Sequence, residues 1–176
     1  MADPESVTRR EVPLEDWATA VAEARDAAYT FFDWLTAVDQ TDAPEDAGFD
    51  IVCHLMDPSK PRALRRLLLR TRVAEGAAVP SITGVFRGAA WHERETHEMF
   101  GVDFDGFDDG TGLGLRPLLL PDGFEGTPLR KSFVLAARAS KPWPGAKEPG
   151  ESEHTKPTGR RRVQAPGVPG PDWGPR

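Results

Sequence analysis

The sequence predicts an α+β fold of two layers, in which helices pack on one face of a small mixed β-sheet and a long extended C-terminal arm follows. Three observations support this prediction. Residues 14–29 have apolar side chains at helical spacing, segments between 30 and 73 alternate apolar and polar side chains, and residues 102–140 combine large apolar residues with prolines and glycines.

The composition is that of a soluble protein with one domain. The chain has 176 residues, 39% of them hydrophobic and 28% charged, which is usual for a globular protein. No apolar run approaches the roughly 18 residues that a membrane helix needs, and no signal-like apolar stretch follows the N-terminus. We therefore expect a protein that stays in the cytoplasm, in solution or as a peripheral subunit.

The cysteine count and the charge distribution exclude some classes of function. Cys53 is the single cysteine, so the chain cannot form an internal disulfide or supply the thiolates of an iron–sulfur cluster. The net charge is −6, but residues 141–176 contain seven Lys and Arg against four Asp and Glu, which makes that segment +3 and the remainder −9. This distribution favours charged protein surfaces over nucleic acid as partners.

The first predicted element is a helix over residues 14–29, preceded by a flexible N-terminus, residues 1–13. Apolar residues recur in the helix at intervals of three and four with charged residues between them, as in an amphipathic helix. These apolar positions are Leu14, Trp17, Val21, Ala24 and Ala28.

Three strands are predicted next. Residues 30–39 alternate as a half-buried strand would. The side chains that share one side of this strand are Phe32, Trp34, Thr36 and Val38. Turn-forming residues 39–48 lead to a second alternating segment, 49–56, so the two strands should form a hairpin. The alternation of residues 64–73 favours a third strand, although its leucines would also suit a helix.

A second helical region should follow these strands. Ser81 can cap its start, and Gly84 and Gly88 interrupt it. The helix should then run over residues 89–100, because Gly101 stands where helices often end in a left-handed residue.

Residues 102–140 should form an extended arm. Prolines and glycines forbid a long helix or a central strand there, yet many side chains are large and apolar. Burying them would contribute about as much free energy as ordering the segment costs, so order requires a docking surface. We expect the arm to pack along another chain, or along its own sheet with one side reserved for a partner. Residues 141–176 should form a basic, Pro- and Gly-rich extended tail.

The charged segment 91–101 lacks the geometry of a metal or catalytic site. His92 and His97 are five residues apart, about 140° around a helix, so they cannot bind one ion as the histidines of H-E-x-x-H do. Glu93 and His97 are only two ligands, and Glu93 and Glu95 point to opposite sides of a helix. We therefore predict no catalytic, cofactor-binding or metal-binding residue. The remaining alternatives are a metal-dependent hydrolase with Glu93, His97 and a third ligand, and a nucleic-acid binder through the tail.

Two charged groups could organise the arm. Arg94 and Glu98 are one helical turn apart and can form a weak surface pair. The planar guanidinium of Arg130 suits a bidentate contact with a carboxylate such as Glu93 or Glu95, which would fold the arm back on the helix. The same charges would equally suit a surface that faces water.

The two motifs V-P-S-I-T-G-V-F-R-G-A-A-W-H-E-R-E-T-H-E-M-F-G, residues 79–101, and L-R-P-L-L-L-P-D-G-F-E-G-T-P-L-R-K-S-F, residues 115–133, carry a family resemblance. They closely resemble the C subunit, of the 30 kDa type, of respiratory complex I, the proton-translocating NADH-quinone oxidoreductase. The resemblance extends over about residues 32–135. The sequence departs from the family pattern at His97, Glu98 and Ser132, and Arg116 is the one arginine left of a pair.

The resemblance implies a non-catalytic scaffold in the peripheral arm of the complex. It would contact the quinone-site D subunit and lie near the B and I subunits, on the cytoplasmic side of the cell membrane and bound there only through the complex. FMN, iron–sulfur clusters and quinone would be held by partner subunits, with no cofactor in this chain and no nucleic acid as partner. An equivalent subunit of a membrane-bound nickel–iron hydrogenase is the alternative. The candidate interface residues are Trp91, Glu93, Arg94, Glu95, Glu98, Arg116, Pro128, Leu129, Arg130 and Lys131.

Overall fold

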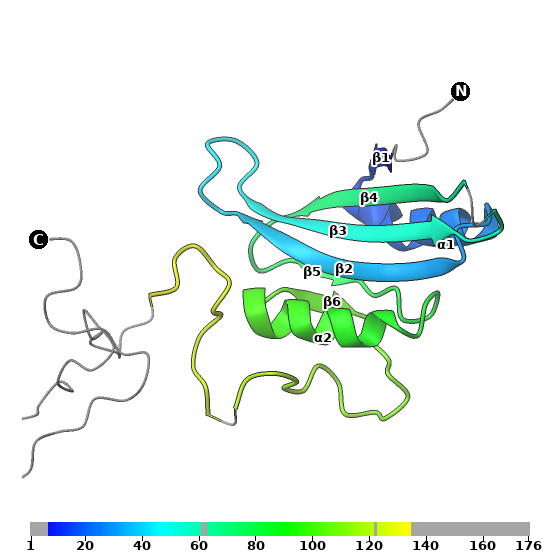
Figure 1. Cartoon of the computed structure of the whole chain (residues 1–176). Helices are drawn as coiled ribbons and strands as arrows, with labels where there is room; N and C mark the ends of the chain where they lie inside the picture. The colour runs from blue at the N-terminus through cyan, green and yellow to red at the C-terminus, as the bar shows by residue number, and fades with distance from the viewer. Residues whose placement is uncertain (1–6, 61–62, 122, 135–176) are drawn as a thin grey trace, which may run out of the picture. The chain divides into compact units, whose positions relative to one another are not determined.

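The structure, a computed structural model, describes residues 7–60, 63–121 and 123–134 (Figure 1). The predicted tail, residues 141–176, and the end of the predicted arm lie outside these residues. The elements in chain order are β1 (Val7–Glu11), a 3-10 turn (Leu14–Asp16), α1 (Trp17–Asp26), β2 (Phe31–Gln40), β3 (Gly48–Asp57), β4 (Arg65–Val73), β5 (Ala78–Pro80), α2 (Ala89–Phe100) and β6 (Asp103–Asp105).

The main sheet has four strands in the order β1-β4-β3-β2. The pairs β2–β3 and β3–β4 are antiparallel and β1 is parallel to β4, so the sheet is mixed. The predicted α+β class, the mixed sheet, the hairpin and the choice of a strand for residues 64–73 are confirmed. Strands β5 and β6 form a separate parallel pair below the sheet (Figure 1).

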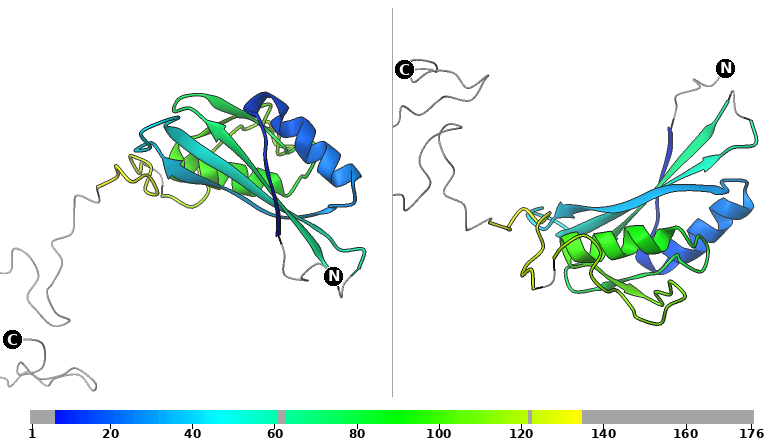
Figure 2. Two further views of the ribbon diagram at one scale, coloured as in Figure 1. Left: turned by 90° about the horizontal axis from the view of Figure 1, so that it is seen from above. Right: turned by 60° about the horizontal axis from the view of Figure 1, so that its bottom comes forward.

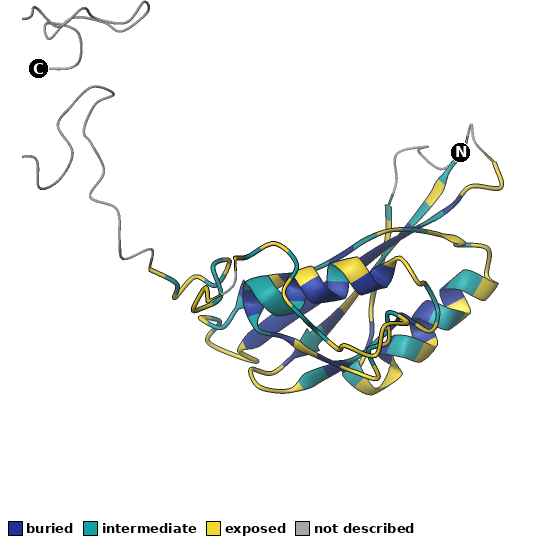
Figure 3. Ribbon diagram, turned by 90° about the horizontal axis from the view of Figure 1, so that it is seen from below, coloured by how far each residue is buried: buried dark blue, intermediate teal, exposed yellow. Residues whose placement is uncertain are grey.

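Both helices contribute to one core on a single face of the sheet. Figure 3 shows α1 and α2 in front of the strands with their buried sides turned toward the sheet. The core side chains of β3 and β4 alternate as the sequence predicted, and each large apolar side chain removed from water stabilises the fold by about 1.5–3 kcal/mol. Almost fully buried members of this core are Trp17, Val21, Leu35, Phe49, Ile51, Leu55, Leu69 and Val79.

Strand β1 corrects the expectation of a flexible N-terminus over residues 1–13. Residues 7–11 pair in parallel with β4, from Val7 opposite Arg66 to Glu11 opposite Arg70. The strand is only five residues long and pairs with none of its sequence neighbours. Its stability depends on β4, where Arg70 lies 59 residues from Glu11 in the sequence. Local sequence patterns do not report such a pairing.

The first helix is shorter than the predicted 14–29. Its α-helical part ends at Asp26, and Ala28 adopts a left-handed φ of 79°. The N–H groups of Ala28 and Tyr29 donate to the carbonyl oxygens of Arg25 and Ala24, which is the hydrogen-bond pattern of a Schellman C-cap. Because an alanine takes the position that glycine usually occupies, the sequence carries no stop signal there.

Strand β2 corrects the expectation that Phe32 shares one side of the strand with Trp34, Thr36 and Val38. The pairing of β2 with β3 is irregular between Phe32 and Trp34, where Asp33 is inserted. One extra residue reverses which side chains face the core. Leu35 and Ala37 are therefore buried on the helix side, while Trp34, Thr36 and Val38 point to the other face, and Val38 is 43% exposed.

Helix α2 has the predicted bounds, and Gly101 ends it with a left-handed φ of 71°. Ser81 does not cap a helix, since residues 81–88 form turns before Ala89. Among the residues that the structure describes, no helix combines the length and the apolar character needed to cross a membrane.

Candidate functional site

Glu93 lies on the buried side of α2 and has no exposed surface. Its carboxylate accepts hydrogen bonds from the Ser81 hydroxyl at 2.7 Å and the Ile82 N–H at 2.8 Å. Burial raises the pKa of Glu93 to about 7, although the two hydrogen bonds oppose this shift. The carboxylate thus binds the turn after β5 to the helix, and Glu93 is not accessible to a partner, contrary to its choice as a candidate interface residue.

Arg94 and Glu98, one turn apart on α2, both bind the main chain of the arm. The Arg94 guanidinium donates to the carbonyl oxygens of Arg116 at 3.2 Å and Pro117 at 2.7 Å. The Glu98 carboxylate accepts from three consecutive N–H groups, those of Leu118, Leu119 and Leu120, at 3.1, 2.8 and 2.9 Å. Burial tends to raise the pKa of Glu98, but these three N–H groups and the Arg94 charge outweigh it and lower the pKa. Arg94 and Glu98 were expected to pair with each other on the surface, but each instead holds the main chain of the arm.

Arg130 forms the second attachment of the arm, with a different carboxylate from those expected. Its guanidinium donates to the Phe100 carbonyl oxygen at 2.5 Å, pairs with Glu75 and lies 5.0 Å from the centre of the Phe49 ring. Gly101 leaves room for the guanidinium. A Cβ atom at this position would lie 3.0 Å from an Arg130 nitrogen, which is closer than an ordinary van der Waals contact. Of the two alternatives left open by the sequence, Arg130 folds the arm onto the domain, and it does so through Glu75 rather than Glu93 or Glu95.

Residues 128–131 close the arm onto the end of α2 and the β2–β3 hairpin. The Leu129 N–H donates to the Met99 carbonyl oxygen at 3.1 Å, next to Pro128. The Lys131 N–H donates to Asp39 at 2.7 Å, and its ammonium group donates to Asp42 at 2.6 Å. Asp39, Asp42 and Glu75 were not identified from the sequence. The concentration of acids around the β2–β3 turn could have indicated Asp39 and Asp42, whereas Glu75 follows β4 and has no such signal.

The Gly-rich segment between β6 and Arg116 folds on itself. Asp109 accepts hydrogen bonds from the N–H and hydroxyl of Thr111 and from the Arg116 guanidinium. These contacts hold the pKa of Asp109 well below its usual range. Arg116 is thus engaged within the segment, which forms a closed turn.

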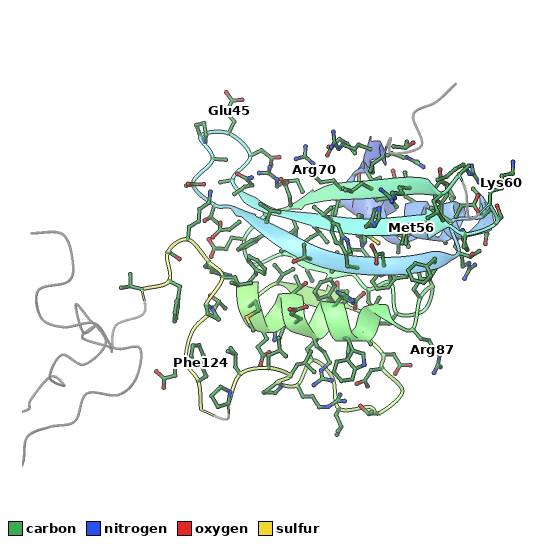
Figure 4. All side chains as sticks on the ribbon, in the orientation of Figure 1. Glu45, Met56, Lys60, Arg70, Arg87 and Phe124 are labelled. Carbon is green, nitrogen blue, oxygen red and sulfur yellow. The ribbon has the colours of Figure 1, made fainter. Side chains whose placement is uncertain are left out.

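Several large apolar side chains stay exposed although the arm is anchored. Trp91 on α2 is 65% exposed and Leu119 on the arm is 58% exposed. Together with His92, Glu95 and Leu118 they line a hollow of about 140 Å³, and we call these five residues the Trp91 patch. A second hollow of about 410 Å³ lies between the C-terminal end of α2 and the arm, and Phe124, labelled in Figure 4, lines it. Further exposed apolar residues of the arm are Leu113, Leu129 and Val134.

The residues of the proposed metal-dependent hydrolase do not assemble. Glu93 is turned into the core, and the His97 ring donates a hydrogen bond to the Val102 carbonyl oxygen, 3.1 Å away. Within residues 7–60, 63–121 and 123–134, no group of three or more His, Cys, Asp and Glu side chains could hold a metal ion. Burial raises the pKa of the Cys53 thiol and keeps it protonated.

Comparison with known proteins gives one consistent family. The sequence model described as the 30 kDa subunit of respiratory-chain NADH dehydrogenase matches residues 10–139. Proteins named as the C subunit of NADH-quinone oxidoreductase are similar: that of Mesorhizobium japonicum is 49% identical over 87 residues, covering 49% of this chain and 39% of the relative. That of Brucella ovis is 37% identical over 125 residues, covering 70% and 58%. The chain spans about half the length of the curated relatives it matches.

Two solved structures share the fold. A trypsin-resistant fragment of Nqo5 has a TM-score of 0.53 and 22% identity, covering 62% of this chain and 86% of the fragment. A chain in the membrane-bound sulfane sulfur reductase, an archaeal respiratory membrane complex, has a TM-score of 0.61 and 23% identity, covering 75% and 74%.

Proposed function

The chain belongs to the family of the 30 kDa subunit of respiratory-chain NADH dehydrogenase, and we propose that it is a non-catalytic scaffold subunit of an NADH-quinone oxidoreductase. The complex would transfer electrons from NADH to quinone and couple this transfer to proton translocation. The role of this chain is to hold neighbouring subunits together.

The observation that carries the proposal is the way the arm is attached. Arg94 and Glu98 bind main-chain groups of the arm, so its path is fixed without burying its side chains. Leu113, Leu119 and Leu129 remain exposed, as does Trp91 on the helix. Exposed apolar side chains on an ordered segment are typical of a protein–protein interface. We therefore propose that the exposed side of the long extended arm, which the sequence predicted, binds a partner subunit.

The partners follow from the family resemblance. We infer contact with the quinone-site D subunit and proximity to the B and I subunits, and partner subunits of the complex would hold FMN, iron–sulfur clusters and quinone. The chain would lie on the cytoplasmic side of the cell membrane and be attached only through the complex. The relatives named as the C subunit of NADH-quinone oxidoreductase support this assignment over the hydrogenase alternative.

The proposal is tested with the double variant Trp91→Lys and Leu119→Lys in the full chain. A buried interface aromatic typically contributes at least about 2 kcal/mol, so assembly should weaken by at least about 30-fold, as measured by native gel electrophoresis of the membrane complex and by its NADH:quinone activity. The isolated variant should melt at the wild-type temperature, because both side chains are exposed.

Two further measurements sharpen the test. Thr19→Lys, an exposed position on α1, is the matched control and should assemble normally. Arg130→Ala should also lower assembly, because it releases the arm. Normal assembly of the double variant would contradict the role of the Trp91 patch. NADH oxidation, or stoichiometric flavin or iron binding, by the isolated chain would contradict the scaffold role.

A further inference from the structure

The face of the sheet opposite the helices carries a row of apolar side chains. Residues that lie directly opposite each other in paired strands share a face, and the register places Trp34, His54 and Leu68 side by side, with Val52 opposite Thr36 in the next row. We call this surface the open face; its residues are Trp34, Val38, Val52, His54, Met56 and Leu68. Neither helix lies on this side of the described sheet (Figures 1 and 2).

The open face combines an apolar centre with charged side chains, because Arg66, Arg70 and Arg72 of β4 lie on it together with Leu68. An antiparallel sheet with one wet face alternates apolar residues inward with polar residues outward. Here the outward side chains of β3 are nearly as buried as its inward ones, since Val52 and His54 are each only 9% exposed. Beside them, Val38 on the edge strand is 43% exposed. The Trp34 ring stacks on His54, so the chain's own side chains provide this cover. Trp34, Met56 and Leu68 are of intermediate exposure beside Val38, and these four apolar side chains form the surface open to a further layer.

The charges around the open face favour an acidic occupant. Arg70 projects on the side away from α2 (Figure 4), and it pairs with Glu11 and Asp50. Arg66 lies on the same face opposite Met56, and Arg9 lies opposite Leu68. Neither Arg66 nor Arg9 forms an ion pair with the other described parts of the chain. A positive edge is thus found on a protein whose net charge is −6.

We propose that the open face is a second docking surface, which receives an acidic amphipathic helix of another protein. The apolar stripe of that helix would cover Trp34, Met56 and Leu68, and its carboxylates would lie against Arg9 and Arg66. Such a helix would complete the sheet as a layer between helices on both faces. Because α2 carries Trp91 and lies on the opposite side of the sheet (Figure 1), this surface is distinct from the Trp91 patch, and the chain would be held between two neighbours.

The first test is charge reversal on the open face. Arg9→Glu combined with Arg66→Glu, in the full chain, should lower its incorporation into the assembled complex by at least about 10-fold, measured on native gels. The matched control, Lys60→Glu with Arg87→Glu, makes the same charge change at exposed positions that are not among the residues of the open face and should assemble normally. Equal incorporation of the two double variants would overturn the proposal.

The second test works even where charge reversal impairs folding. A photo-crosslinking amino acid at Val38 in the native complex should link to another protein, at a segment with apolar residues at helical spacing and an excess of Asp and Glu. A link to a second copy of this chain, a link to a segment without these features, or no link while the same probe at Leu119 does react would each overturn the proposal.

The outcomes separate this inference from the scaffold role. Loss of assembly only in the Trp91 and Leu119 variant retains the proposed function and overturns the open-face proposal. Loss only in the Arg9 and Arg66 variant retains the open-face proposal and contradicts the role of the Trp91 patch.

Discussion

At the scale of single residues, Glu93 shows how a buried carboxylate can serve structure. It has no exposed surface, yet both of its oxygens accept hydrogen bonds, from Ser81 and Ile82. A buried polar group that is fully hydrogen-bonded costs much less than an unsatisfied one. The interaction fixes the turn between β5 and α2, and so sets where the helix starts relative to the core.

We predict that Glu93 makes stability depend on pH. Its pKa rises from the ordinary 4.5 to about 7 in the folded protein, so between these values the folded state binds more protons than the unfolded state. The free energy of unfolding should therefore fall as pH rises through this range. The shift of about 2.5 units corresponds to about 3 kcal/mol, and the loss should be complete above about pH 7 to 8.

Glu93→Gln provides the measurement. The amide can still accept from the Ile82 N–H and donate to the Ser81 oxygen, but it does not ionise. Urea unfolding of both proteins should show the variant gaining about 3 kcal/mol relative to wild type between about pH 4 and pH 8. A difference that does not change with pH would mean that Glu93 ionises at its ordinary pKa.

At the scale of elements, three sides of α2 have different roles. Ala89, Glu93 and Phe100 face the core, and Arg94 and Glu98 bind the arm. This leaves Trp91 and Glu95 exposed on the remaining side, where positions four apart are neighbours on a helix surface. One twelve-residue helix thus connects the core, the arm and the free surface.

We predict that Glu98→Ala releases the arm locally. The carboxylate accepts from three consecutive N–H groups, and hydrogen bonds to a charged group contribute about 1.5–3 kcal/mol each in favourable cases. Hydrogen exchange at the amides of residues 118–120 should accelerate by at least about 10-fold, measured by NMR or mass spectrometry. Glu95→Ala, on the exposed side of the same helix, is the control and should leave these amides unchanged. Unchanged exchange in Glu98→Ala would show that other contacts hold the arm.

At the scale of the whole molecule, the described residues present two different surfaces. The arm side offers the Trp91 patch and a hollow of about 410 Å³, and the sheet side offers the open face. A scaffold needs more than one contact surface, because it holds partners in place relative to each other. Both surfaces have apolar centres with charged neighbours, which is the usual anatomy of an interface.

The isolated chain should self-associate in the absence of its partners, because exposed apolar surface promotes association. Sedimentation velocity at micromolar concentration should show species larger than a monomer. The Trp91→Lys and Leu119→Lys variant should shift this distribution toward monomer, while Thr19→Lys should not. A monodisperse wild-type monomer would argue that these side chains are insufficient to drive association.

The sequence predicted those elements whose signals are local. The bounds 89–100 followed from helical spacing and Gly101, and strands β3 and β4 followed from alternation. Two wrong predictions, the end of the first helix and the faces of the first predicted strand, have equally specific causes. An alanine, Ala28, takes the left-handed position at the end of α1, and the residue inserted at Asp33 reverses the faces of β2.

The sequence by itself determined the fold class, the periodic elements, the family motifs and the apolar character of the arm, because each depends on spacing along the chain. Only the tertiary structure decided which charges meet. Arg130 binds Glu75 across 55 residues and the Lys131 ammonium group binds Asp42 across 89 residues, while Glu93, adjacent to Arg94 in sequence, is turned into the core. The physical reason is that folding brings distant strands and turns together, and the energetic cost of burying a charge then selects the partners that can satisfy it.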